Sequence, residues 1–245
     1  IISCGQEEAV EETQMDETTQ KLQERIDLFA PTVIEADISH LTDRQKKVIH
    51  YLVKAGQYAD EIFWHQTSPS AKPTRDSLIM DDSPEAKVAL EFVKIMYGPY
   101  DLIMDGKRML GEGPEYKPET ANFYPPGMTR EEFNSYVETH PDQKEELESQ
   151  YTVVVREDDG SLKAIPYYQA YEQQIMVANY LDSAADYCDN ASLQNYLKLR
   201  AEALLVGERE PDGAPAELGV RLLERPRRRD RLVAAEVERA DRHRP

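Results

Sequence analysis

The sequence has few cysteines, no long apolar runs and a shortage of positive charge. Its two cysteines, Cys4 and Cys188, are too few for a disulfide framework or a cysteine-rich zinc site. No stretch approaches the ~20 consecutive apolar residues of a membrane-spanning helix. With 29 Lys and Arg against 47 Asp and Glu, the net charge is -18, which repels nucleic acid and anionic lipid headgroups. We therefore expect no nucleic-acid partner.

Motifs for metal, nucleotide and serine chemistry are also missing. None of the five histidines has another histidine three to five residues away, so the zinc-binding helix motif His-Glu-x-x-His is absent. The sequence has no Gly-x-Ser-x-Gly elbow and no Walker loop. We expect no catalytic residue, metal or other cofactor in this chain.

What is present is a chain of 245 residues with 40% apolar content, enough to fill a core. Thr42 and Gln45 form a capping-box pattern, and apolar residues then recur at helical spacing up to Trp64. Ser83-Pro84 begins a second predicted helix that stops at Gly98-Pro99. A third is predicted to begin at Thr129.

The second half predicts a hairpin followed by two helices. Residues 151–156 and 161–165 have strand composition and flank a turn at Asp159-Gly160. Apolar spacing predicts one long helix from Tyr168 and another over residues 193–205. The expected fold class is therefore mainly α with a small β hairpin near 151–165, an α+β arrangement.

The N-terminal residues Ile1 to Gly5 resemble a bacterial lipobox, with Cys4 as the lipidated residue. Residues 1–24 are then a lipobox remnant and an acidic tether. On this interpretation the protein is lipid-anchored in the bacterial cell envelope, either periplasmic or at the surface, and reaches a membrane only through Cys4. The alternative is a clipped cytosolic N-terminus with an incidental cysteine.

The composition changes abruptly after Leu205. Residues 206–245 contain ten Arg, no Lys and no aromatic residue, whereas all 14 Tyr precede them. Short apolar stripes in 217–225 and 231–239 are compatible with a partly helical extension. An Arg, Pro, Ala and Gly bias is also typical of an out-of-frame or chimaeric terminus, which we favour. The expected organisation is thus 1–24, a helical domain over 25–205, and an Arg-rich tail that is either disordered or out of frame.

Two groups of residues, most of them aromatic, are candidates for ligand binding. Tyr167 and Tyr168 stand where a predicted strand passes into a helix, and a phenol there can donate a hydrogen bond to a bound carbonyl. Tyr171 lies on the apolar stripe, so we expect it to be a packing residue.

The second group is Asn122, Phe123 and Tyr124, in an aromatic loop that prolines make rigid. Such a loop either lines a cleft or packs over the core.

Residues 121–133 (ANFYPPGMTREEF) resemble a segment of bacterial proteins related to dipeptidyl peptidase III. The order of hairpin, Tyr167-Tyr168, long helix and the later stretch 196–205 is also similar to that family. The resemblance covers residues 25–205 and implies the helical N-terminal part of a larger metallopeptidase fold. Members of the family are zinc enzymes that remove dipeptides from the N-termini of short peptides.

The resemblance also implies roles for particular residues. A tyrosine at the start of this helix helps to polarise the scissile carbonyl in the family, and Tyr167 matches best, with Tyr168 next if the register shifts by one. The family's zinc ligands lie on helices that would follow Leu205, where this chain has the Arg-rich segment. We therefore expect a non-catalytic part, inactive alone, that acts on short peptides only when the zinc-binding half is present.

Two other hypotheses remain open. A non-enzymatic surface lipoprotein would bind peptides or glycans through a Tyr-rich helical domain. A structural interaction protein would require a folded tail after Leu205.

Overall fold

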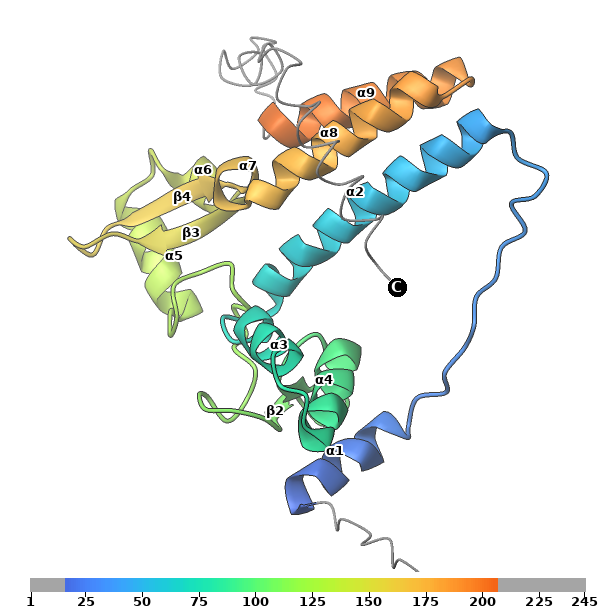
Figure 1. The fold of residues 1–245 in the computed structure, drawn as a ribbon. Helices are drawn as coiled ribbons and strands as arrows, with labels where there is room; N and C mark the ends of the chain where they lie inside the picture. Colours follow the sequence, from blue (N-terminus) through green and yellow to red (C-terminus); the bar gives the residue numbers. More distant parts are fainter. Residues whose placement is uncertain (1–15, 207–245) are drawn as a thin grey trace, which may run out of the picture. The chain divides into compact units, whose positions relative to one another are not determined.

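The computed structural model describes residues 16–206, which form two compact units. The first comprises residues 16–39, 60–148 and 153–164, and the second comprises residues 40–59, 149–152 and 165–206. The described chain is mainly helical with small antiparallel strand pairs (Figure 1), so the predicted fold class is confirmed. Cys4 and the segment 207–245 lie outside the described residues.

Most of the short elements belong to the first unit. Its helices are α1 (Glu17–Ile26), α3 (Ala71–Ile79), α4 (Pro84–Met96), α5 (Arg130–Thr139) and α6 (Lys144–Leu147). Its strand pairs are β1 (Tyr100–Asp101) with β2 (Lys107–Arg108), and most of the predicted hairpin of β3 (Thr152–Arg156) with β4 (Leu162–Pro166). Thr152, Ile165 and Pro166, at the ends of these two strands, are counted in the second unit. The long helix α2 (Asp43–Thr67) begins in the second unit and ends in the first.

The first unit has two separate apolar cores. One lies between α1, α3, α4 and the end of α2, where Leu22, Trp64 and Phe92 are almost fully buried. The other joins α5 and α6 to the β3–β4 hairpin through Val137, Leu147 and other apolar side chains. Each core holds a few short elements together by removing their apolar faces from water.

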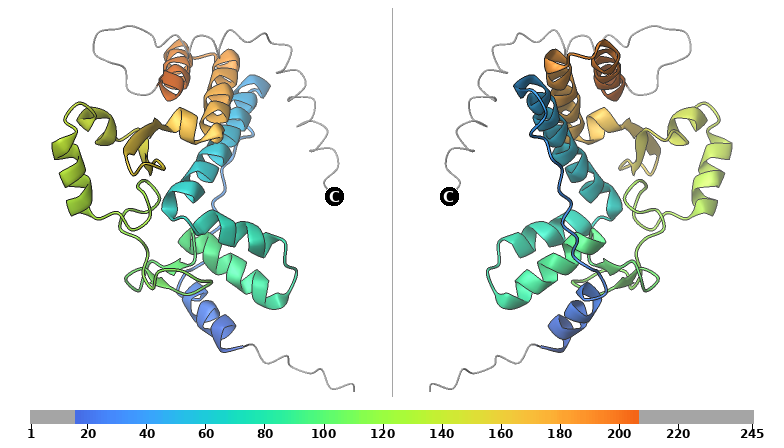
Figure 2. Two further views of the ribbon diagram at one scale, coloured as in Figure 1. Left: turned by 90° about the vertical axis from the view of Figure 1, so that its left-hand side faces the viewer. Right: turned by 90° about the vertical axis from the view of Figure 1, so that its right-hand side faces the viewer.

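The second unit consists of the first part of α2 with α7 (Tyr167–Ala170), α8 (Glu172–Tyr187) and α9 (Ala191–Val206). Helices α8 and α9 lie side by side (Figures 1 and 2). Stacked tyrosine rings join α2 to α8: Tyr51 lies 5.6 Å from Tyr187 and 6.3 Å from Tyr180, measured between ring centroids. Tyr58 lies 5.6 Å from Tyr180 in the same way.

Helix starts follow the predicted capping residues. The Thr42 hydroxyl accepts from the Gln45 backbone N–H at 3.2 Å, and the Thr42 N–H donates to Gln45 Oε1 at 2.9 Å, which is a complete capping box. Ser83 accepts from the Ala86 N–H, and Thr129 accepts from the Glu132 N–H. The predicted starts of α2, α4 and α5 are therefore confirmed.

The predicted end of α4 is also confirmed, although the left-handed residue is Tyr97 (φ 52°) and not the glycine. The Gly98 N–H donates to the Val93 carbonyl at 3.0 Å, which closes the helix. Gly98 has φ 148°, and a Cβ added there would lie 3.2 Å from the Ala71 Cβ. The glycine is needed because α3 approaches the backbone so closely.

Helix α1 corrects the expected extent of the acidic tether, because residues 17–24 are helical and not extended. Asp16 caps the helix by accepting from the N–H groups of Thr18 and Thr19 at 2.8 and 3.1 Å. Leu22 and Ile26, four residues apart, are buried against the core beside α4. Two apolar side chains at helical spacing outweigh the acidic composition of the stretch.

The predicted long helix from Tyr168 is also corrected, because Tyr171 divides it into α7 and α8. Tyr171 has extended backbone angles (φ -125°, ψ 102°), while its N–H still donates to the Tyr167 carbonyl at 2.8 Å. The break lets the Tyr171 ring enter the interior, where it is 7% exposed. Its predicted role in packing is confirmed.

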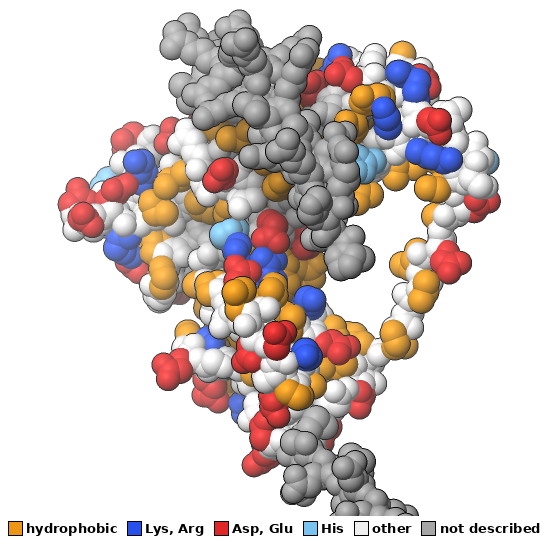
Figure 3. Space-filling model, viewed as in Figure 1, with side chains coloured by type: hydrophobic (Ala, Val, Ile, Leu, Met, Phe, Trp, Pro, Cys, Tyr) orange, Lys and Arg blue, Asp and Glu red, His pale blue; other side chains and the backbone are white. Residues whose placement is uncertain are grey.

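Some apolar side chains remain at the surface. Figure 3 shows hydrophobic side chains along the extended segment between α1 and α2, in which Val33 and Ile34 are largely exposed. Within residues 16–206, every helix is too short or too polar to span a membrane.

Candidate functional site

The loop that precedes α5 is fixed at two points within the first unit. The Asn122 side-chain Nδ2 donates to the His65 carbonyl at 2.7 Å, and its backbone N–H donates to the Gln66 carbonyl at 3.1 Å. Both carbonyls belong to the last turn of α2, where helix geometry leaves them without a partner inside the helix. The Phe123 carbonyl accepts from the Val154 N–H of β3 at 2.8 Å. The loop is therefore attached to a helix end on one side and to the hairpin on the other.

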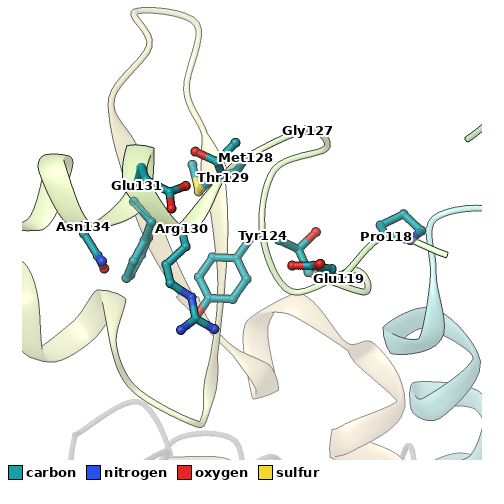
Figure 4. Close-up of a pocket in the computed structure, with 11 residues that line it drawn as sticks. Pro118, Glu119, Tyr124, Gly127, Met128, Thr129, Arg130, Glu131 and Asn134 are labelled. Carbon is teal, nitrogen blue, oxygen red and sulfur yellow. The ribbon is translucent and has the colours of Figure 1, made fainter. Parts of the chain in front are cut away.

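A cavity of about 870 Å³ lies between this loop and the start of α5 (Figure 4). The cavity is the size of a typical small-molecule or peptide-side-chain site. Its lining residues come from the loop and from the first turns of α5. They are Pro118, Glu119, Thr120, Tyr124, Gly127, Met128, Thr129, Arg130, Glu131, Phe133 and Asn134.

The apolar part of the cavity is built on the core of α5, α6 and the hairpin. The Tyr124 and Phe133 rings meet edge to face, with centroids 5.2 Å apart and planes at 79°. Met128 is buried in the same core. Because these side chains also fill the core, the apolar wall is fixed by folding and is present before any ligand arrives.

The polar part is a rim of exposed side chains. Glu119, Arg130 and Glu131 are all exposed and line the cavity. In Figure 4 the ends of the Arg130 side chain and the Tyr124 ring lie near each other, and Glu119 lies on the other side of the Tyr124 ring. The rim therefore offers two carboxylates and one guanidinium next to an aromatic wall. This arrangement suits a small zwitterionic or cationic ligand with an apolar side chain.

Of the three predicted loop residues, only Tyr124 lines this cavity. Asn122 holds the loop to α2 and lines a second, smaller cavity of about 170 Å³ together with His65, Lys72 and Asp76. The backbone of Phe123 pairs with the hairpin, and its side chain is half-buried. The sequence analysis did not identify the cavity residues at the start of α5, which are Arg130, Phe133 and Asn134. The capping pattern at Thr129 did predict the first turns of the helix that carries them.

Tyr167 and Tyr168 are in the second unit, and α7 begins at Tyr167, one residue before the predicted helix start at Tyr168. The Tyr167 N–H donates to the Tyr151 carbonyl at 2.9 Å, and its ring lies 5.5 Å from that of Tyr171. The Tyr168 hydroxyl accepts from Gln169 Nε2 at 3.0 Å. Both tyrosines are half-buried. They therefore belong to a different unit from Asn122, Phe123 and Tyr124.

The charged cluster beside the smaller cavity connects α2 to α3. Arg75 makes two hydrogen bonds of 2.8 Å to the two carboxylate oxygens of Glu61, and its guanidinium lies 4.7 Å from the Trp64 ring. Hydrogen bonding to Glu61 raises the pKa of Arg75. Burial, and then the charge of Lys72, lower the pKa of His65. These charged groups contact one another, so we assign the cluster a structural role.

Zinc does not fit the described residues. Within residues 16–206, no three His, Cys, Asp or Glu side chains are grouped so that they could hold a metal ion. Asp76, which lines the small cavity with His65, is paired with Arg75, and so is Glu61. A zinc site needs three or four such ligands about one point.

Comparisons with known proteins identify relatives of this architecture. The solved structure of DPP III from Caldithrix abyssi matches 76% of this chain and 35% of its own, with 41% identity and a TM-score of 0.72. Dipeptidyl-peptidase III from Corallococcus sp. strain EGB matches the same shares, with 28% identity and a TM-score of 0.71. The predicted resemblance to dipeptidyl peptidase III is thus confirmed for the fold.

A curated plant protein is also similar. "Nudix hydrolase 3" of Arabidopsis thaliana is 25% identical over 237 residues, which cover 76% of this chain and 31% of that protein. No protein-family profile matches the chain. The chain spans about a third of the length of each of these three proteins.

Proposed function

We propose that this chain is a non-catalytic, peptide-binding part of a dipeptidyl peptidase III-like exopeptidase, which removes dipeptides from the N-termini of short peptides. The similarity to two solved bacterial peptidases over 76% of the chain carries the proposal. Within residues 16–206, no three His, Cys, Asp or Glu side chains are grouped so that they could hold a metal ion. In the proposed protein, the zinc ligands belong to polypeptide outside the described residues.

The α5 cavity is the proposed contact for the peptide. An exopeptidase of this class recognises a free N-terminal ammonium group, and the Glu119 and Glu131 carboxylates of the rim are suitable acceptors for it. Tyr124 and Phe133 offer an apolar wall for a side chain of the peptide. Arg130 would favour a carboxylate on the ligand, so peptides with an acidic residue are admitted as well.

Tyr167 is the proposed position from which a phenol donates a hydrogen bond to the scissile carbonyl, with Tyr168 as the next candidate. Its place at the first residue of α7 supports this assignment. A hydroxyl donor stabilises the negative charge that develops on a carbonyl oxygen during peptide hydrolysis. We derive no metal-dependent step from this chain, because its described residues do not supply the ligands.

We further propose that the protein is anchored in the bacterial cell envelope through a lipid on Cys4, and that it acts on peptides and not on nucleic acid. The net charge of -18 supports the last point. Glycan binding by the tyrosines of the second unit is a weaker hypothesis. Sugars stack on free aromatic faces, whereas Tyr51, Tyr180 and Tyr187 stack on one another.

The proposal is tested by zinc content, hydrolysis and peptide binding of the purified 245-residue chain. We expect no bound zinc and no release of dipeptides, together with binding of a short Ala/Val tetrapeptide measured by calorimetry. Tyr124→Ala is expected to weaken binding about tenfold, and N-acetylation of the peptide to weaken it as well.

Tyr116→Ala is the matched control, since Tyr116 is half-exposed in the same unit and does not line the cavity. Stoichiometric zinc with dipeptide release would overturn the non-catalytic assignment. Peptide binding that Tyr124→Ala leaves unchanged would overturn the assignment of the cavity.

A further inference from the structure

Helix α9 has apolar side chains on two opposite faces. Leu197, Ala201 and Leu205, four residues apart, are 3 to 4% exposed and pack in the cores shared with α8. Tyr196 and Leu199 are 61% and 52% exposed. A helix turns about 100° per residue, so these two side chains stand roughly opposite the buried row. We call the exposed residues Tyr196, Leu199 and Ala203 the outer face of α9.

Charged residues mark the borders between the two faces. At 100° per residue, Lys198 and Glu202 fall on one border and Arg200 falls on the other. A helix on a protein surface has a single apolar stripe opposite a polar face, whereas a helix with apolar residues on both sides is packed between two neighbours. Within the described residues, α9 has its packing partner on one side only.

The lengths of the relatives indicate what covers the outer face. The described residues 16–206 make up only slightly more of the chain than the 76% that matches the two solved peptidases. That match spans 35% of each of those chains, so about two thirds of such a fold is further polypeptide. Helix α9 is the last element of the described part. A helix at that position, apolar on both sides, is placed to receive the following layer.

We propose that the outer face of α9 is the docking surface for an amphipathic helix in the polypeptide that completes a dipeptidyl peptidase III-like fold. This proposal rests on the proposed function only in assuming such a larger fold. Tyr196 and Leu199 provide the apolar contacts, with the Tyr196 hydroxyl placed to reach the polar border. The docked helix has apolar residues at three- and four-residue spacing and a carboxylate opposite Arg200.

The test compares labelling of one cysteine in two proteins. Leu199→Cys is introduced into the 245-residue chain with Cys4→Ser and Cys188→Ala, and into a chimaera in which residues 16–206 replace the matched segment of DPP III from Caldithrix abyssi. Maleimide is expected to label Cys at 199 readily in the short chain and about tenfold more slowly in the folded chimaera. Asp158→Cys, at the exposed hairpin turn, is the control and is expected to react equally in both.

Each other outcome overturns the proposal. If the cysteine is protected in the monomeric 245-residue chain, residues 207–245 cover the outer face. If the protection disappears on dilution, a second copy of the chain covers it. Equal labelling in the two folded proteins shows that the face does not receive the rest of the fold. Dipeptide release by the chimaera reports separately on the proposed function, because a protected but inactive chimaera leaves docking intact.

Discussion

Arg25 Nε of α1 lies 2.9 Å from Asp101 Oδ2 of β1, and the Asp101 side chain is completely buried. The other carboxylate oxygen, Oδ1, accepts from the backbone N–H groups of Ile103 and Met104. Oδ2 has no well-aligned hydrogen bond in the described structure, so the Arg25 charge is what compensates it. The contact connects the most N-terminal described helix to the rest of its unit.

Arg25→Ala is therefore expected to destabilise the protein by about 2–3 kcal/mol, because it leaves a buried carboxylate without its cation. The Arg25 side chain is 31% exposed, which places the effect at the lower end for buried pairs. Urea unfolding measures the change. Lys21→Ala, which removes the exposed pair with Glu17, is the control and is expected to leave the stability nearly unchanged. Equal effects of the two variants would contradict the assignment.

Two glycines are expected to respond to alanine in opposite directions. Gly98→Ala forces φ 148° on an alanine and brings its Cβ to 3.2 Å from the Ala71 Cβ, so it should destabilise by about 1–3 kcal/mol. Gly56 lies inside α2 with open space around it, and Gly56→Ala should stabilise by about 0.5–1 kcal/mol. Thermal unfolding of both variants checks the prediction. Stability changes in the same direction for the two variants would contradict it.

The stability of the protein should decrease as the pH falls below neutral, because of His65. Its folded-state pKa is lowered below the ordinary 6.5, mainly by burial, so the folded protein prefers the neutral ring. As pH falls below 6.5 the unfolded chain takes up this proton first, and stability decreases until pH passes the folded pKa. Between pH 7.5 and 5.5, the melting temperature of His65→Gln should drop by less than that of the wild-type protein. The exposed His40→Gln variant serves as control, and wild-type-like loss in His65→Gln would refute the prediction.

The bond from Asn122 to the end of α2 should matter for both stability and the cavity. Asn122→Asp replaces the Nδ2 donor with an oxygen that faces the His65 carbonyl, which should cost about 1–3 kcal/mol. Because the same loop supplies Tyr124, peptide affinity should fall as well, although Asn122 does not line the larger cavity. Asn134→Asp, at the exposed rim, is the comparison. Unchanged stability in Asn122→Asp would show that the bond does not hold the loop.

Local signals in the sequence predicted much of the fold. Thr42, Ser83 and Thr129 act as caps because a side-chain oxygen reaches a nearby backbone N–H, which depends only on adjacent residues. Helix α1 and the break at Tyr171 were not predicted, because both depend on burial against distant residues. Composition alone describes α1 as a solvated tether, whereas Leu22 is almost fully buried.

The site was harder to predict than the fold. Tyr124 was identified from the proline-rich loop, but the loop's attachment to His65 and Val154 joins residues that are far apart in the sequence. Sequence patterns describe neighbours along the chain and not the partner across a cavity. The rim residues Glu119 and Arg130 come from two segments that meet only after folding.

The double attachment of the loop, to the end of α2 and to β3, has a consequence for how binding specificity can change. The bonds that hold the loop use the Asn122 side chain and backbone atoms, whereas the rim uses the exposed side chains of Glu119, Arg130 and Glu131. Anchoring and recognition therefore reside in different atoms. Substitutions at the rim can alter which ligands are accepted while the preorganised frame is retained, so the cavity is open to evolutionary or engineered retargeting at little cost in stability.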